Sequence, residues 1–281
     1  LHYPLRRQRQ MCIRDRRWME LWKKFGRDSM VPGLKSFKES FSDFMDQYVI
    51  IGGAACDIYM ESEDSFFRAT KDLDIVLIVE ALTPEFVSKF WQYVQTAGYQ
   101  HIDKSKQKPE FYRFSKPISK EYPAMIELFS RPPYNVGLSF AANVVPIHLD
   151  DSSISLSAIL LNDEYYEFMK SGRISIDGIS ILDYQYIIPF KAKAWLDLSE
   201  RKISGESIDS KNIKKHKNDI FRLSALLLEG KSLSLPDKIA EDMLEFITKV
   251  ADEPVDMKSL GLRGMKVESM LELICKYYML R

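Results

Sequence analysis

The strongest structural signal in the sequence is residues 72–79, a mainly β-branched apolar run that begins with two aspartates and predicts a strand. Alternate side chains of a strand point to the same face, so Asp72 and Asp74 can present two carboxylates to one site. Mg²⁺ is typically held by one or two carboxylates, with substrate phosphates completing its shell. The pair is therefore a candidate metal site. The alternative interpretation is that both aspartates are simply solvated at the start of the strand, because so short a motif also occurs by chance.

A glycine pair precedes this strand. Residues 48–51 form a short apolar run that stops at Gly52 and Gly53, and residues 54–60 then predict a helix. Glycine lacks a Cβ atom, so its backbone can approach phosphate oxygens closely, and the start of a helix offers free N–H donors. The pair is a candidate phosphate-binding turn, and its alternative is a simple tight turn between a strand and a helix.

Glu127 lies in the middle of residues 124–130, which predict another strand. A carboxylate in such a place is costly to desolvate without a partner. If this strand lies beside the first, Glu127 is a candidate third metal ligand that helps to deprotonate an acceptor hydroxyl. The alternative is a solvent-facing side chain on a sheet with one exposed face.

The remaining pattern predicts an α+β fold with a mixed-sheet half and a mostly helical half. We place the boundary near residue 150, which gives one domain at 17–150 and another at 151–281; a single intertwined domain is the alternative. The hydrophobic spacing predicts helices from 32 to about 47, 83 to about 97, 184–202, about 209–228, 236 to about 252 and 259 to the end, a strand at 110–115, and a hairpin around Gly178 within 173–182.

Composition restricts the location and the partners of the protein. Lysine plus arginine equals aspartate plus glutamate at 40 each, so attraction to nucleic acid has to come from local clusters of charge. No apolar run approaches the roughly 20 residues that span a bilayer. The cysteines, Cys12, Cys56 and Cys275, show neither zinc-site spacing nor a disulfide framework. We therefore expect a cytoplasmic protein with no membrane partner.

The start of the chain has an unusual sequence. Residues 10–16 resemble the translated transposon end that is used to tag sequencing libraries. We therefore expect residues 1–16 to be a sequencing artefact and the chain to come from a microbe, and we leave this stretch out of the fold prediction.

Taken together, these motifs resemble the DNA polymerase β-type nucleotidyltransferase superfamily, and within it the AbiEii/AbiGii and MenT-like toxin families of bacterial toxin–antitoxin systems. The resemblance is carried by residues 50–55, by Arg68 to Asp74 and by Glu127. Weaker signatures follow at residues 189–193 and 215–219. The resemblance covers residues 47–130 well and the helical half less securely.

The resemblance implies a mixed-sheet nucleotidyltransferase domain followed by a mostly helical domain, with Mg²⁺ as cofactor and an NTP as substrate. It also implies that a lysine and an aspartate of the helical domain support nucleotide binding and catalysis. Lys191 and Lys193 are alternatives for the lysine, because residues two apart on a helix lie on different faces. The roles implied are metal binding for Asp72, Asp74 and Glu127, catalysis for these and Asp219, and substrate binding for Gly52, Gly53, Arg68, Thr70, Lys191 or Lys193, and Lys217. The alternative for Arg68 and Thr70 is that they brace the turn before the strand. The alternative for Asp219 is a surface ion pair with Lys215, one helical turn away.

We therefore expect a metal-dependent enzyme that moves a nucleotide from an NTP to an acceptor. A basic stretch favours RNA, such as a tRNA end, as that acceptor, although it could also be a solvated helix face. This stretch consists of Lys211, Lys214, Lys215 and Lys217, with Arg201 and Lys202 nearby. A toxin would have a cognate antitoxin protein as partner. Two further functions are compatible with the sequence: a non-catalytic protein that binds nucleotide, RNA or an antitoxin, and a nucleotidyltransferase that modifies an antibiotic.

Overall fold

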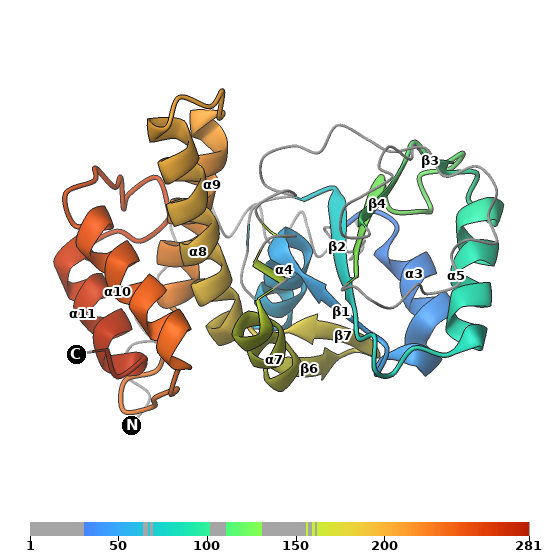
Figure 1. The fold of residues 1–281 in the computed structure, drawn as a ribbon, viewed down its shortest axis with the longest axis horizontal. Coiled ribbons are helices and arrows are strands. Elements are labelled where there is room, and N and C mark those ends of the chain that lie inside the picture. The colour runs from blue at the N-terminus through green and yellow to red at the C-terminus, as the bar shows by residue number, and fades with distance from the viewer. Residues whose placement is uncertain are drawn as a thin grey trace, which may run out of the picture.

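The structure is a computed structural model that describes residues 31–63, 67, 70–101, 111–130, 156, 159, 160 and 162–280. In this part of the chain, a mixed sheet of seven strands is followed by a group of helices, so the fold is α+β as expected (Figure 1). The expected artefact at residues 1–16 and the candidate Arg68 lie outside the described residues.

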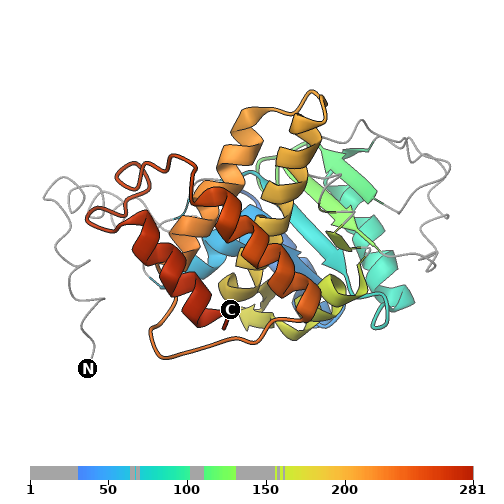
Figure 2. The ribbon, with the colours of Figure 1, turned by 60° about the vertical axis from the view of Figure 1, so that its left-hand side comes forward.

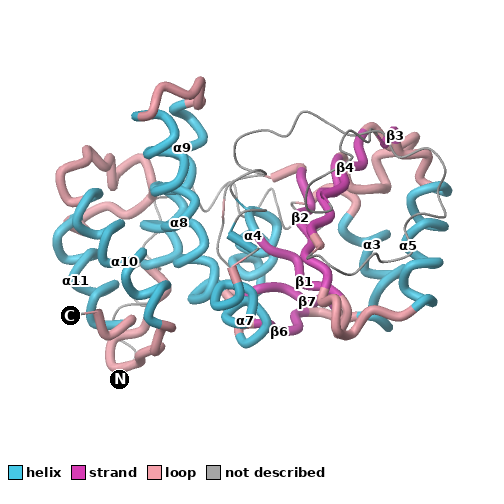
Figure 3. The backbone as a smooth tube through the Cα atoms, in the orientation of Figure 1, coloured by secondary structure: helices cyan, strands magenta, loops and turns pink. Residues whose placement is uncertain are grey.

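Figure 3 shows the strands crossing the middle of the molecule, with helices on both sides. β2 runs parallel to β5, and β1 runs antiparallel to β2 and parallel to β7. The other neighbouring pairs are antiparallel. Across the sheet the order is β3 (Gln100–His101), β4 (Phe111–Ser115), β5 (Met125–Phe129), β2 (Asp72–Leu77), β1 (Tyr48–Ile51), β7 (Ile179–Leu182) and β6 (Arg173–Ile176).

The helices cover the sheet from two sides. α3 and α5 lie on one side, and α4, α7 and the helical half lie on the other (Figure 1). Phe114 of β4 faces α5, because its ring centroid lies 5.5 Å from that of Phe90 and 5.9 Å from that of Trp91. The bounds are α3 (Leu34–Phe41), α4 (Gly52–Ser62), α5 (Pro84–Thr96), α7 (Asp163–Ser171), α8 (Tyr184–Ile203), α9 (Ser210–Ser224), α10 (Asp237–Val250) and α11 (Val267–Tyr277), and a short 3₁₀ helix, η1 (Ser42–Phe44), follows α3.

The sheet continues past the boundary that we expected near residue 150. Asp177 and Gly178 both have positive φ, 54° and 76°, as a two-residue hairpin turn requires, and they join β6 to β7. β7 then pairs with β1 in the middle of the sheet, with Ile181 opposite Ile50. The sheet therefore ends at Leu182. Local hydrophobic patterns do not reveal this, because β7 pairs with a strand that is distant in the sequence.

The helical half begins directly after the sheet. Asp183 caps α8, because its side chain accepts a hydrogen bond from the Gln185 backbone N–H. α8 packs along α9, and the two form a hairpin that extends past the sheet (Figures 1 and 2). α10 packs against α8, with the rings of Trp195 and Phe246 5.3 Å apart. Among the described residues, no helix combines the length and the hydrophobicity needed to cross a bilayer.

Candidate active site

The register of four strands builds the polar centre of the sheet. Asp74 on β2 lies opposite Ile51 on β1 and opposite Glu127 on β5, and Arg113 on β4 lies opposite Glu127. Directly opposite residues of neighbouring strands place their side chains on the same face of a sheet. Asp72 shares this face because it precedes Asp74 by two residues. The three carboxylates expected from the sequence therefore lie on one face.

This face forms the floor of a cavity of about 390 Å³. The walls come from the start of α4 and from the sides of α8 and α9 that face the sheet. The lining side chains of each helix recur at the spacing of one helix face. They are Ile187, Phe190, Lys191 and Ala194 on α8, and Asn212, Lys215 and His216 on α9; Gly52, Gly53, Thr70, Leu156 and Leu182 complete the lining.

Gly52 brings the backbone against the carboxylates. Its φ is 69°, a left-handed conformation that side chains other than hydrogen disfavour. A Cβ atom at this position would also overlap the Oδ2 atom of Asp74. Gly53 follows as the second, buried residue of α4, so the free N–H groups at the start of this helix lie at the cavity.

The surroundings of Asp74 on the cavity floor disfavour its ionised form. Desolvation by the surrounding protein, and next the charge of Glu127, raise the pKa of Asp74 well above its usual range. Lys215 and Lys191 oppose this shift from the helical side, and Asp72 adds to it. Bringing a cation to this floor would therefore stabilise the ionised form of Asp74.

Glu127 has a partner that the sequence did not indicate. Arg113 donates from Nε to Glu127 Oε1 over 2.7 Å, and its Nη2 atom contacts the same oxygen. The side chains are only 14% and 7% exposed, respectively. Only the pairing of β4 with β5 brings these residues together, since they are 14 positions apart in the sequence.

The two aspartates fit a magnesium ion, and the third carboxylate, Glu127, is paired with an arginine. Within the described residues, no group of three or more His, Cys, Asp or Glu side chains is arranged to hold a metal ion. Glu127, the expected third ligand, lines the same cavity and is paired with Arg113. Asp72 and Asp74 still offer the hard oxygen atoms that Mg²⁺ prefers when phosphates complete its shell.

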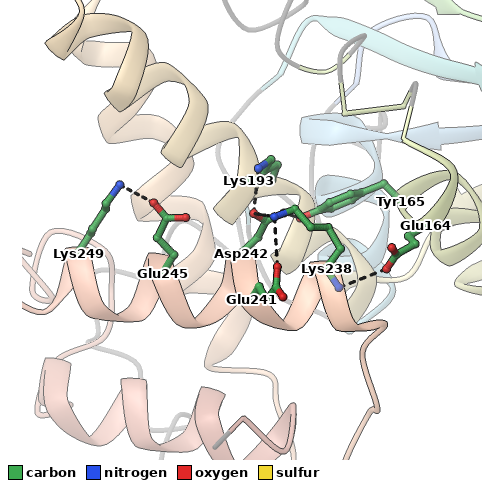
Figure 4. Close-up of polar contacts among 8 residues, drawn as sticks. All are labelled: Glu164, Tyr165, Lys193, Lys238, Glu241, Asp242, Glu245 and Lys249. Atoms are coloured by element: carbon green, nitrogen blue, oxygen red, sulfur yellow. Dashed lines mark hydrogen bonds and ion pairs between the residues drawn. The ribbon is translucent and has the colours of Figure 1, made fainter.

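The structure separates the two candidate lysines of α8. Lys191 lines the cavity, and its Nζ lies 2.8 Å from Asp219 Oδ2 on α9. Both side chains are buried. Asp219 is not among the described lining residues; it lies behind Lys191 and also contacts Arg222 at 3.4 Å. Lys193 is absent from the lining and pairs with Asp242 at 2.9 Å (Figure 4).

Lys215 of α9 lines the cavity, and the expected Lys217 does not. Lys217 is 5% exposed, and its Nζ donates to Glu253 Oε2 over 2.7 Å and to the Pro254 carbonyl over 3.1 Å. It ties α9 to the segment after α10 and does not line the cavity. Lys215, two residues earlier and on another helix face, lines it instead, together with Asn212.

Comparisons with known solved structures give distant similarities. No protein-family model and no curated protein matches the chain. Among solved structures, it is similar to an antigenic nucleotidyltransferase-like protein from Paracoccidioides brasiliensis, with 15% identity, a TM-score of 0.42 and coverage of 86% of this chain and 99% of that one. It is also similar to the Megavirus polyadenylate synthase, with 14% identity, a TM-score of 0.32 and coverage of 78% of this chain and 37% of that one. At such distances the function has to be inferred from the site itself.

Proposed function

We propose that this chain is a Mg²⁺-dependent nucleotidyltransferase that moves a nucleotide from an NTP to an acceptor hydroxyl. One observation carries the proposal: a single cavity combines two strand aspartates, a glycine-led helix start and two lysines from facing helices. Carboxylates, backbone N–H groups and cations are the groups that bind a metal–triphosphate complex. The cavity, at about 390 Å³, has the size of a small-molecule site.

Each group has a role in this reaction. Asp72 and Asp74 would hold the metal ion, which, when bound, neutralises phosphate charge and favours in-line displacement. Gly52 lets the start of α4 lie against the Asp74 carboxylate, so the free backbone N–H groups of this helix start are close to the proposed metal site. Lys191 and Lys215 would offset the negative charge of the departing pyrophosphate as the acceptor oxygen bonds to the α-phosphorus. Apolar side chains of α8, such as Phe190, provide a surface for the base.

Labelled substrates test this function. The purified protein is incubated with each α-labelled NTP, Mg²⁺ and total microbial RNA, and we expect label transfer together with pyrophosphate release. Asp74→Asn should abolish both, and Lys215→Ala should lower the rate by roughly 100-fold, as for the loss of one charge-stabilising group. Lys249→Ala, at an exposed position on α10, is the matched control and should have no effect. A non-catalytic protein would bind NTP without releasing pyrophosphate, and full activity of Asp74→Asn would contradict the proposal.

We further propose that the acceptor is RNA. Lys211 and Lys214 on α9 and Lys202 at the end of α8 are exposed on the hairpin that also carries Lys215. Exposed lysines on one element can follow a phosphate backbone, and such binding weakens steeply with salt. Lys217 is excluded from this surface, because its side chain is buried and paired with Glu253.

A charge-reversal variant tests the acceptor. Lys211→Glu with Lys214→Glu should lose RNA labelling while NTP binding stays intact, because neither residue lines the cavity. The loss of RNA affinity should be largest at low salt and should shrink as the salt concentration rises, because salt weakens the phosphate contacts. Label that appears only in small molecules or in protein would exclude an RNA acceptor.

The resemblance to AbiEii/AbiGii and MenT-like toxins supports a biological role for this activity as the toxin of a toxin–antitoxin pair. Expression of the chain in bacteria should then arrest growth, and Asp74→Asn should remove the effect. A small neighbouring gene that restores growth would supply the antitoxin. Unchanged growth with an active, soluble protein would argue against the toxin role.

A further inference from the structure

The Arg113–Glu127 pair lies beside the proposed metal site and has no role in the function proposed above. The Nε and Nη2 atoms of Arg113 both contact the same oxygen, Glu127 Oε1. Charge-assisted hydrogen bonds of this kind are the strong ones in proteins, and they are screened little where water is largely excluded. The low exposure of both side chains places the pair in such surroundings.

The pair also has a fixed position relative to the aspartates. Glu127 lies directly between Asp74 and Arg113 in the row across β2, β5 and β4. Glu127 can therefore turn toward the aspartates or toward the arginine. In the structure it contacts the arginine through two of the guanidinium nitrogens.

We infer that Arg113 keeps Glu127 out of the metal shell, so that the metal is held by Asp72 and Asp74 alone. This inference rests on the proposed function for the presence of a metal–NTP complex. A shell with two protein carboxylates leaves positions for triphosphate oxygens and water, which suits Mg²⁺. The paired Glu127 also repels the triphosphate less than an unpaired carboxylate would. Arg113 is therefore a positioning residue that acts through Glu127.

Binding of Mn²⁺ to the full chain, followed by electron paramagnetic resonance without NTP, tests the inference directly. Glu127→Gln should change the Mn²⁺ affinity by no more than about twofold, whereas Asp74→Asn should weaken it at least about tenfold, because only the latter loses a ligand. Arg113→Met should release Glu127 to the metal and tighten binding by about tenfold, since an added carboxylate raises cation affinity. The double variant Arg113→Met with Glu127→Gln should return to the wild-type affinity.

The outcomes separate this inference from the proposed function. Wild-type protein that binds Mn²⁺ neither alone nor with NTP would overturn the proposed function, and the inference with it. Wild-type protein that binds Mn²⁺ while Glu127→Gln weakens binding as much as Asp74→Asn would overturn the inference alone. Unchanged or weaker binding in folded Arg113→Met would do the same. If Arg113→Met does not fold, the comparison of Glu127→Gln with Asp74→Asn still tests the inference. Glu127→Gln should fold, because glutamine keeps an acceptor oxygen for Arg113.

Discussion

At the scale of single residues, Gly52 combines two constraints that are separable by mutation. Its φ of 69° disfavours any side chain, and a Cβ atom would also collide with Asp74 Oδ2. The first constraint affects folding alone. The second acts on a proposed metal ligand, so it should affect the reaction as well.

Gly52→Ala should therefore be inactive as well as destabilised. Gly261→Ala is the matched control, because its φ is 81° and a Cβ atom there meets nothing within 4 Å. Gly261→Ala should lose about 1 kcal/mol of unfolding free energy from backbone strain, and Gly52→Ala should lose more because of the added collision with Asp74. Only Gly52→Ala should lose nucleotidyl transfer per folded molecule. Urea unfolding and a transfer assay measure the two effects, and equal transfer rates would reduce Gly52 to a structural turn.

The sequence predicts some site residues well and others poorly, for geometric reasons. Asp72, Asp74 and the glycine pair are predictable because strand alternation and a strand–turn–helix motif are local patterns. Arg113 is not predictable, because nothing local indicates that β4 will lie beside β5. Lys215 and Lys217 are equally basic, and only the rotation of α9 against α8 determines which of them reaches the cavity.

At the scale of elements, a buried carboxylate connects three helices. Asp242 of α10 is 2% exposed and lies 2.9 Å from Lys193 of α8 and 3.6 Å from Lys238 one turn away. It also accepts a hydrogen bond from the hydroxyl of Tyr165 on α7, over 3.0 Å (Figure 4). Burial, followed by the charge of Asp242, raises the pKa of Tyr165, so that hydroxyl stays protonated.

Asp242→Asn should destabilise the protein by about 1–3 kcal/mol, because it weakens hydrogen bonds to a charged group at a buried site. Glu245→Gln is the control on the same helix. Its partner Lys249 is 50% exposed and Glu245 itself 49%, so this change should cost less than about 0.5 kcal/mol (Figure 4). Guanidinium unfolding measures both. A similar cost for the two variants would mean that the network around Asp242 contributes no more than a surface pair.

Most elements begin and end near the positions that the sequence predicts, and the exceptions have local causes. β1 and β2 start where expected, at Tyr48 and Asp72, because apolar runs and polar or glycine stops are sharp there. β3 is not predicted, because its two residues are too few to show an alternation of apolar and polar side chains. α11 starts at Val267 and not near Ser259, because two glycines with positive φ, Gly261 and Gly264, turn the chain first.

At the scale of the whole molecule, the sheet and the helical half depend on each other, because both contribute residues to the cavity. β7 covers an edge of β1, and α8 begins two residues after the end of β7, at Tyr184. The cavity consequently needs residues from both sides of the expected boundary, such as Asp74 and Lys191.

A chain cut after residue 150 should therefore not fold as an independent domain. It would lack β7, and the buried strand β1 would become an unprotected edge, which favours aggregation. Thermal melting followed by circular dichroism should show no cooperative transition for residues 17–150, in contrast to the full chain. A sharp transition in this fragment would show that the division expected from the sequence is an independent folding unit.

The pairing of β1 with β7 has a consequence for synthesis on the ribosome. Ile50 and Ile181 are 131 positions apart (181 − 50), so β1 emerges long before its second neighbour exists. At about 5–20 residues per second, this interval lasts roughly 7–26 seconds. Asp72 and Asp74 are also made early, whereas Lys215 arrives later still. A nascent chain therefore carries its carboxylates without the opposing lysines, and nucleotide binding should begin only after α8 and α9 have been made.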